Sequence, residues 1–368
     1  MVSCYIHVPF CAQRCGYCDF NTYLIGHAGI TPEQWLDGVR TELAAQAGRI
    51  GQVATVFFGG GTPSLLGAGP LTAALQAVRE TFGVASGAEI TVEANPESVT
   101  GPLLDQLLEA DVTRLSLGMQ SGDPAVLAVL ERVHQPGQAV RCVEAAHAAG
   151  FSDVSVDLIY GTPGETLTSW QGTLDAALAA APEHVSCYGL IVEPGTPLAR
   201  RIAAGALPDV DDDLMADEYE LADEALEAAG LAWYELSNWA LGGHQCRHNL
   251  AYWRSDDWVG VGPGAHSHVG QMRWWNHKNP RVWAQALRRG EMPRAGSERL
   301  DQAMAHEEAV LLELRLASGL PLAKLTAAEQ ARLPGLVEAG KLQVAHGHIA
   351  LTRKGRLLAD QVTLQLLA

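Results

Sequence analysis

The sequence predicts an α/β fold built on a parallel, barrel-like sheet, and three observations support this class. Short apolar strands and amphipathic helices alternate about six times over roughly the first 200 of the 368 residues, a rhythm typical of βαβ units. The strands are continuous apolar runs, as expected where both faces of a parallel sheet are covered. Polar residues follow these runs at their carboxyl ends, where barrel-like α/β folds carry their sites.

Strands and helices alternate from the first residues of the chain. Residues 2–8 form an apolar strand, and the helix expected over 32–49 has Trp35, Val39 and Leu43 on one face. The later predicted strands are 53–58, 89–93, 114–119, 154–160 and 184–192. The helices between them are 71–82, 103–110, 136–150 and 167–181.

The character of the sequence changes in its second half. An amphipathic helix over 211–230 leads into a less regular stretch, 233–283, rich in Trp, His, Gly and Asn. Two helices over 300–318 and 327–339 precede a hairpin around His346-Gly347, and Thr352 is placed to cap a last helix. Helices followed by a small hairpin resemble a winged-helix module. The predicted domains are a barrel over 1–210, an α+β extension over 211–295 and a winged-helix-like domain over 296–368.

Composition limits the classes of function. The formal net charge is −17, with 42 acidic and 25 basic residues, so binding nucleic acid is not the expected main task. Seven cysteines, an odd number, without a visible signal peptide indicate a reducing cytoplasm rather than a disulfide framework. No apolar run approaches the ~18 residues that span a bilayer. The sequence is compatible with a peripheral contact with a membrane.

Three cysteines near the start of the chain carry the strongest functional signal. Cys11, Cys15 and Cys18 have the spacing C-x-x-x-C-x-x-C on one short loop. Three thiolates so close together can hold three irons of a cubic [4Fe–4S] cluster, which usually takes four. No fourth cysteine lies near them in the sequence, so the remaining iron would keep an open position for a small molecule. We therefore expect a site of chemistry rather than a simple electron relay.

A zinc site is the alternative interpretation of these cysteines. Structural zinc normally takes four protein ligands, typically as two separated pairs. A second pair of cysteines is absent, and Cys246 with His244 or His248 would have to complete the site across a long stretch of chain. The spacing therefore favours the iron–sulfur interpretation.

The cysteine pattern resembles that of the radical S-adenosylmethionine (SAM) superfamily. The resemblance implies a partial (β/α)6 TIM-like barrel in which SAM chelates the open iron and is cleaved to a 5′-deoxyadenosyl radical. It places Tyr17 near the adenine. It also implies that Gly60, Gly61 and Thr62, which follow an apolar strand, hold the amino group of SAM. Taken alone, this glycine run would be only a tight turn.

Other positions resemble the branch of the superfamily that contains oxygen-independent coproporphyrinogen III oxidases and their HemW-like relatives. By this resemblance five residues contact SAM: Tyr5, Glu93, Gln120 (the ribose), Arg132 and Asp157. Each alone is more often a solvated strand end or a surface charge. Their placement at successive strand ends supports a shared site.

Two departures favour the HemW-like heme chaperones over the oxidases. The oxidases carry a further cysteine two positions after the third, where this chain has Phe20. They also have an extension before the cysteine loop, whereas Cys11 stands almost at the start of this sequence. The resemblance thus implies a protein that binds heme and passes it to client respiratory proteins.

A second segment is similar to the heme motif of that branch. His248, Tyr252 and Trp253 match its His-Asn-x-x-Tyr-Trp pattern, in which the histidine is implicated in heme binding. Imidazole is a common axial ligand of heme iron, and the aromatic rings offer flat apolar faces. Cys246 is a competing thiolate ligand. The alternative is a core histidine packed between two aromatic residues, which the residues alone would favour.

The expected function is therefore a cytoplasmic heme chaperone with a [4Fe–4S] cluster, SAM and heme as cofactors. Its expected partners are heme, a client hemoprotein and an electron donor such as flavodoxin or ferredoxin. The sequence is also compatible with a homodimer. One alternative is an oxidase that decarboxylates coproporphyrinogen III in porphyrin biosynthesis. Another is a DNA-binding regulator using Lys341, Arg353, Lys354 and Arg356, which the net charge disfavours.

Overall fold

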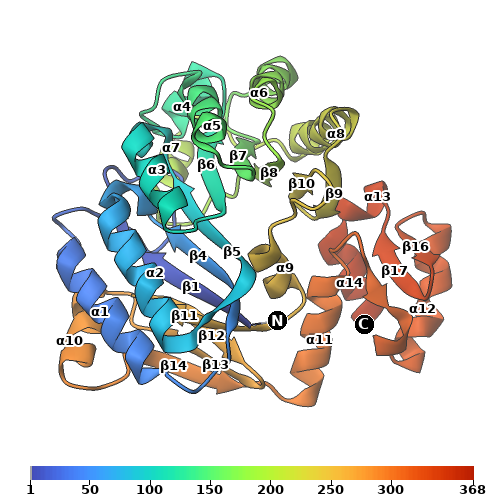
Figure 1. Cartoon of the computed structure of the whole chain (residues 1–368). Helices are drawn as coiled ribbons and strands as arrows, with labels where there is room; N and C mark the ends of the chain where they lie inside the picture. Colours follow the sequence, from blue (N-terminus) through green and yellow to red (C-terminus); the bar gives the residue numbers. More distant parts are fainter. Residues whose placement is uncertain (1) are drawn as a thin grey trace.

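Six parallel strands form the centre of the fold (Figure 1). The computed structural model describes residues 2–368. In sheet order the six strands are β1 (Val2–Val8), β4 (Val53–Gly60), β5 (Val84–Ala94), β6 (Arg114–Gln120), β7 (Val154–Tyr160) and β8 (His184–Gly189). Every neighbouring pair among them is parallel. The predicted βαβ architecture is confirmed.

Helices pack on the outside of this sheet (Figure 1). They are α1 (Pro32–Ala45), α2 (Ala68–Phe82), α3 (Gly101–Glu109), α5 (Gln138–Ala149), α6 (Leu167–Ala179) and α8 (Asp212–Ala228). A capping box at Thr31 starts α1, as its side chain accepts a hydrogen bond from the Gln34 amide. The predicted apolar face of α1 is fully buried through Trp35, Val39 and Leu43.

Further strands extend both edges of the central sheet. At one edge β11 (Asp257–Val261) pairs parallel to β1 and is followed by antiparallel β12 (His266–Val269), β13 (Met272–Asn276) and β14 (Arg294–Arg299). At the other edge are the antiparallel strands β10 (Asn238–Ala240) and β9 (Ala232–Glu235). Over residues 2–368, β14 and β9 remain the two ends of a 12-stranded sheet. The barrel is therefore open, in agreement with the predicted partial barrel.

The two faces of the central strands have different chemistry. In β1, Cys4, Ile6 and Val8 belong to the main hydrophobic core, whereas the alternate residues Ser3, Tyr5 and His7 face the opposite way. That inner face is rich in polar groups in all six strands, among them Thr55, Glu89, Glu93, Arg114, Ser116, Asp157 and Ser186. The sheet thus packs its apolar face against the helices and keeps a polar interior.

The stretch expected to be irregular, 233–283, is largely ordered into secondary structure. It contains β9 to β13 and the helices α9 (Arg247–Trp253) and α10 (Pro280–Arg288). The strands of this stretch are only three to five residues long, so the sequence pattern did not reveal them. The structure also adds three pairs of short elements: α4 (Pro124–Val129) and α7 (Pro197–Ala203), β2 (Phe10–Cys11) and β3 (Tyr23–Leu24), and the 3₁₀ turns η1 (Pro63–Leu66) and η2 (Pro96–Ser98).

The last seventy residues pack around a second hydrophobic core that includes Val310, Leu314, Ile349 and Val362. Their helices are α11 (Gln302–Glu313), η3 (Leu322–Lys324), α12 (Ala327–Glu338), α13 (Arg353–Arg356) and α14 (Ala359–Leu367). Their strands are β15 (Leu320–Pro321), β16 (Leu342–Ala345) and β17 (His348–Leu351). The predicted hairpin is present, and the Thr352 side chain caps α13 by accepting from the Gly355 amide.

No helix within residues 2–368 is both long enough and apolar enough to cross a bilayer.

Candidate functional site

The cysteine loop lies at the carboxyl ends of the barrel strands and is held on two sides. On one side the Gly61 amide donates to the Val8 carbonyl. On the other, the Gly16 amide donates to the Leu130 carbonyl, and the Gly16 carbonyl accepts from the Leu198 amide. Residues distant in the chain thus hold this short loop in place through backbone hydrogen bonds.

The three thiols of the loop lie close to one another. Cys11 and Cys18 are half-buried, and burial is the main cause that raises the pKa of each thiol, with neighbouring cysteine charges adding to it. Thr62 donates to Sγ of Cys11 at 3.8 Å, and Arg132 Nη1 donates to Sγ of Cys15 at 3.5 Å. All the described cysteines are free thiols. An arginine beside a thiol favours the thiolate that binds metal.

The donor set suits an iron–sulfur cube better than a single ion. Within residues 2–368, no three His, Cys, Asp or Glu side chains converge closely enough to hold one metal ion. In a cube each thiolate binds its own iron, so the sulfurs need not converge on one point. Half-buried Cys11, Cys15 and Cys18 fit that requirement.

The glycine run after β4 brings backbone close to the loop. The Gly60 amide donates to Oε2 of Glu93 at 3.0 Å. Gly60 has φ of 114°, and a Cβ there would lie 2.4 Å from His7. A Cβ on Gly61 would lie 2.4 Å from the Phe10 carbonyl oxygen. Only glycine fits both positions, so the run is more than a turn.

Two predicted carboxylates lie on the inner face, and one of them, Glu93, is next to the glycine run. Burial raises the pKa of Glu93 to about 8, and the charge of Asp157 adds to the shift. Asp157 accepts from Ser186 at 2.7 Å and from Ser116 at 2.8 Å, while burial raises its pKa as well.

Tyr5 is held by a hydrogen bond to His7. The Nε2 atom of His7 donates to the Asn21 carbonyl, so Nδ1 of the neutral ring accepts from the Tyr5 hydroxyl at 3.0 Å.

Arg132 links the cysteine loop to the ends of two strands. Its Nη2 donates to Oδ1 of Asn95 at 2.9 Å and to the Gly118 carbonyl at 3.0 Å. Asn95 in turn donates to Oγ1 of Thr62 at 3.0 Å. Asn95 was not among the residues predicted for the site, although its place directly after a strand was a signal in the sequence. Gln120 ends β6 with φ of 65°, which is rare for a residue other than glycine.

The inner face keeps accessible surface at the predicted SAM residues. Tyr5, Glu93, Gln120, Arg132 and Asp157 are each half-buried, whereas most outer-face residues of the same strands are fully buried. Tyr17 packs at the edge of an apolar cluster that contains Leu130, Ile159, Leu190 and Leu198. These side chains therefore keep part of their surface accessible.

The predicted heme segment lies on α9, which packs against the inner face of β1 and β4. His248 is 1% exposed, and its ring nitrogens contact Thr55 Oγ1 at 2.7 Å and the Tyr252 hydroxyl at 2.9 Å. His248 and Tyr252 are four residues apart on α9, so they share one face of this helix. Trp253 is half-buried. Burial raises the pKa of the Cys246 thiol to about 12, and this thiol donates to Glu89. Neither His248 nor Cys246 offers a free ligand atom in this conformation.

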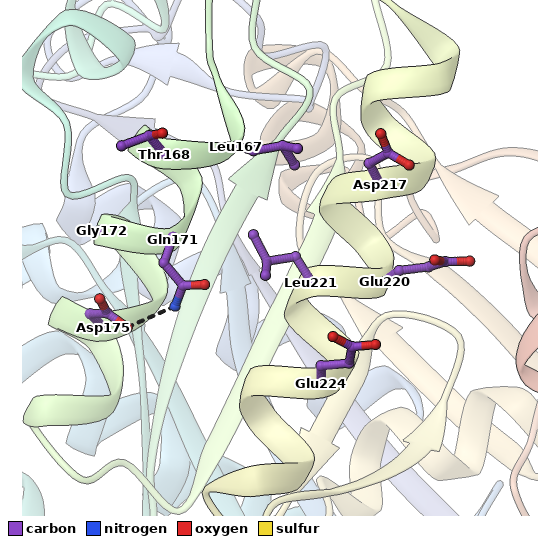
Figure 2. Close-up of a pocket in the computed structure, with 9 residues that line it drawn as sticks. All are labelled: Leu167, Thr168, Gln171, Gly172, Asp175, Asp217, Glu220, Leu221 and Glu224. Carbon is purple, nitrogen blue, oxygen red and sulfur yellow. Dashed lines mark hydrogen bonds between the residues drawn. The ribbon is translucent and has the colours of Figure 1, made fainter.

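A groove of about 620 Å³ lies between α6 and α8 (Figure 2). Its lining is mainly acidic and apolar and includes Asp175, Asp217, Glu220, Glu224 and Leu221. None of the predicted site residues lines it, so it is separate from the site at the barrel mouth.

Comparisons with known proteins agree with this geometry. The sequence profile of the Radical SAM superfamily matches residues 5–177. The chain is 50% identical over 366 residues to "Heme chaperone HemW" of Mycobacterium tuberculosis, covering 99% of this chain and 94% of that protein. It is 32% identical to the protein of the same name from Bacillus subtilis, covering 98% of each chain.

A solved structure shares the fold. Coproporphyrinogen III oxidase (HemN) from Escherichia coli, described as a radical SAM enzyme, superposes with a TM-score of 0.86 at 23% identity, covering 99% of this chain and 89% of that chain. At this identity the likeness shows the fold alone. Because sequence identity extends over nearly the whole length of the HemW proteins, the chain belongs to the HemW family of the radical SAM superfamily.

Proposed function

We propose that this protein is a heme chaperone that binds heme and transfers it to client hemoproteins, with a [4Fe–4S] cluster and SAM bound at the barrel mouth. The observation that carries the proposal is the 50% identity, over nearly its full length, to a protein named as a heme chaperone. The free thiols suit a reducing compartment, and we place the protein in the cytoplasm.

Cys11, Cys15 and Cys18 would hold the cluster. A cluster bound at three corners supplies one-electron chemistry when present, with the remaining iron open to a ligand. Arg132 and Thr62 donate toward two of these sulfurs and would stabilise them as thiolates. The electron would come from a separate donor such as a flavodoxin or ferredoxin.

The predicted SAM contacts would surround the amino acid and nucleoside parts of the cofactor. The half-buried Glu93 carboxylate, beside the amides of Gly60 and Gly61, can accept an ammonium group. Gln120 ends β6 and would bond the ribose, and Asp157, in the middle of β7, would supply a further polar contact to SAM. Tyr5 and Tyr17 would supply apolar walls with polar tips.

Heme ligation by His248 remains a prediction. It requires the bonds of His248 to Thr55 and Tyr252 to break, because both ring nitrogens are engaged. The flat faces of Tyr252 and Trp253 would then contact the porphyrin. Phe20, whose side chain is 64% exposed, stands at the position where the oxidases carry a further cysteine. This observation favours the chaperone over the oxidase branch.

One anaerobic experiment tests the proposal. The full-length protein is reconstituted with iron and sulfide, then given heme, or in parallel coproporphyrinogen III with SAM and dithionite. We expect stable heme uptake and transfer to an apo-hemoprotein, without decarboxylated product. Formation of protoporphyrinogen, or failure to retain heme through gel filtration, would contradict it.

A further inference from the structure

The His248 ring is packed as a part of the barrel interior. It stacks on Phe57 with ring centroids 5.1 Å apart and planes at 28°, and lies 6.5 Å from the Tyr5 ring. Tyr252 meets it edge-on at 4.9 Å. Helix α9 thus places the His248 ring inside the barrel near Ser3 and Thr55, which lie toward the amino ends of β1 and β4. The cysteine loop lies at the opposite, carboxyl ends of these strands.

The hydrogen bonds assign one neutral tautomer to this ring. Thr55 donates its only hydroxyl proton to Oγ of Ser3 at 2.8 Å, so Nδ1 of His248 must be the donor to Thr55. Nε2 then accepts from the Tyr252 hydroxyl. Burial lowers the pKa of His248 to about 3. The ring therefore adds no positive charge next to a pocket that we assign to a cationic sulfonium.

Phe57 lies between the His248 ring and the glycine run. Its ring stacks on Tyr5 with centroids 6.3 Å apart. An ideal Cβ on Gly59 would lie 2.8 Å from Cε1 of Phe57 and 3.0 Å from Oε1 of Glu93. Phe57 thus packs between the rings of His248 and Tyr5 and lies beside the Gly59 backbone, which is in turn next to Glu93. A shift of the Phe57 ring toward Gly59 would therefore press on the backbone that lies against Glu93.

We propose that His248 is a positioning residue of the SAM pocket: by bonding Thr55 and Tyr252 it fixes Phe57, and Phe57 keeps Glu93 and the glycine run in place. The proposal rests on the SAM assignment made above and is independent of heme ligation. It explains why an imidazole with two occupied nitrogens is built into the polar interior of this barrel.

His184 provides a matched control. It is also a buried interior histidine, 2% exposed, with ring nitrogens 2.8 Å from Ser155 Oγ and 2.8 Å from the Tyr234 hydroxyl. Replacing either histidine removes the same hydrogen-bonding ring from the interior. His248 packs directly on Phe57 and lies near Tyr5, whereas His184 is connected to the predicted SAM pocket only through Ser155, whose hydroxyl also interacts with Asp157.

The test uses full-length, cluster-reconstituted protein and measures SAM affinity by anaerobic equilibrium dialysis, with the EPR spectrum of the reduced cluster as a second readout. His248→Ala and Phe57→Leu should each weaken SAM binding roughly tenfold and reduce the spectral change caused by SAM. His248→Gln, which keeps an acceptor for Tyr252, should recover part of the affinity. His184→Ala should stay within about twofold of wild type.

Three results would overturn the inference. Wild-type affinity and spectra in both His248→Ala and Phe57→Leu would remove the positioning role. An equal loss in His184→Ala would show a general effect of barrel stability; circular dichroism confirms that each variant is folded. Absence of SAM binding by the wild type would instead refute the SAM assignment itself. Because Phe57→Leu leaves the His248 hydrogen bonds intact, misfolding of His248→Ala alone would still leave the inference open to refutation.

Discussion

At the scale of single residues, the site depends on groups whose ionisation is set by their surroundings. Glu93 accepts a backbone hydrogen bond from Gly60, yet burial and the nearby Asp157 raise its pKa to about 8. The ligand-free carboxyl is therefore mainly protonated at neutral pH. An ammonium group bound beside it would favour the ionised form.

SAM binding should consequently release a proton and weaken as the pH is lowered. Affinity should fall by up to about tenfold per pH unit over roughly pH 7.5 to 6, a range below the titration of the ligand's own α-amino group. Calorimetry in buffers of different ionisation enthalpy measures both the affinity and the proton release. Glu93→Gln should bind more weakly and without this pH dependence. An unchanged pH dependence in that variant would contradict the assigned role of Glu93.

Gly60 should tolerate no side chain. Its φ of 114° is strained for alanine, and the new Cβ would lie 2.4 Å from the His7 ring. Gly150, with φ of 119° but its nearest neighbour at 3.7 Å, is the matched control. Gly150→Ala should cost about 1–2 kcal/mol of unfolding free energy from backbone strain alone.

Gly60→Ala should cost more than the control and should also reduce cluster retention, because His7 and the loop must shift. Urea unfolding and iron content after reconstitution measure the two effects. Equal losses in Gly60→Ala and Gly150→Ala would argue against the close approach of Gly60 and His7.

At the scale of elements, α8 connects the barrel to the C-terminal segment. Asp223 on α8 is 1% exposed at its side chain and pairs with Arg353 at 2.7 Å and with Arg356 at 2.9 Å. It also accepts from the Trp239 indole at 2.8 Å. Arg356 lies over the Trp233 ring at 3.8 Å. The predicted basic surface of this segment is thus partly used within the chain.

Asp223→Asn should loosen the C-terminal segment from the barrel. Removing one partner of a buried ion pair typically costs about 3–5 kcal/mol. Hydrogen exchange in α13 and α14 should rise, and limited proteolysis should cut near residue 296. Glu224→Gln is the control, because its 66%-exposed side chain pairs with Arg353 only at 3.4 Å and should change stability by less than about 1 kcal/mol. Unchanged exchange in Asp223→Asn would contradict the docking role.

At the scale of the whole molecule, buried acids set the pH dependence of stability. Burial is the main cause that raises the pKa values of five carboxyls to about 7 or 8: Glu42, Glu93, Glu165, Glu218 and Glu235. It lowers the pKa of buried histidines, among them His7, His134 and His248. The carboxyls and the histidines therefore change the free energy of unfolding in opposite directions as the pH varies.

The ligand-free protein should therefore lose stability as the pH rises from about 6 toward about 8.5. Over this alkaline limb the folded carboxyls, whose pKa values are raised to about 7 or 8, bind more protons than the unfolded ones, so the free energy of unfolding falls. Below about pH 6.5 the unfolded histidines bind extra protons and oppose the effect of the carboxyls, so the profile should flatten there. Thermal unfolding in matched buffers measures this profile. Glu218→Gln should flatten the alkaline limb, and a melting temperature that rises over that limb would contradict the assignment.

Much of the fold and part of the site were predictable from local patterns. The alternating apolar runs predicted the six parallel strands, and the cysteine spacing predicted a metal-binding loop. The elements over 233–283 were not predicted, because the strands there are only three to five residues long and give little periodic signal. The link from Arg132 through Asn95 to Thr62 was missed for a different reason, because it joins residues that lie 37 and 33 positions apart in the chain.

The sequence by itself determined the βαβ order, the cysteine loop and, through identity to relatives, the family. Only the tertiary structure decided how the His248 segment is used in this conformation. Periodicity records which residues are apolar and how far apart they lie along the chain. It does not record which distant side chain will satisfy a buried imidazole, and here Thr55, Phe57 and Tyr252 converge on His248 from separate elements.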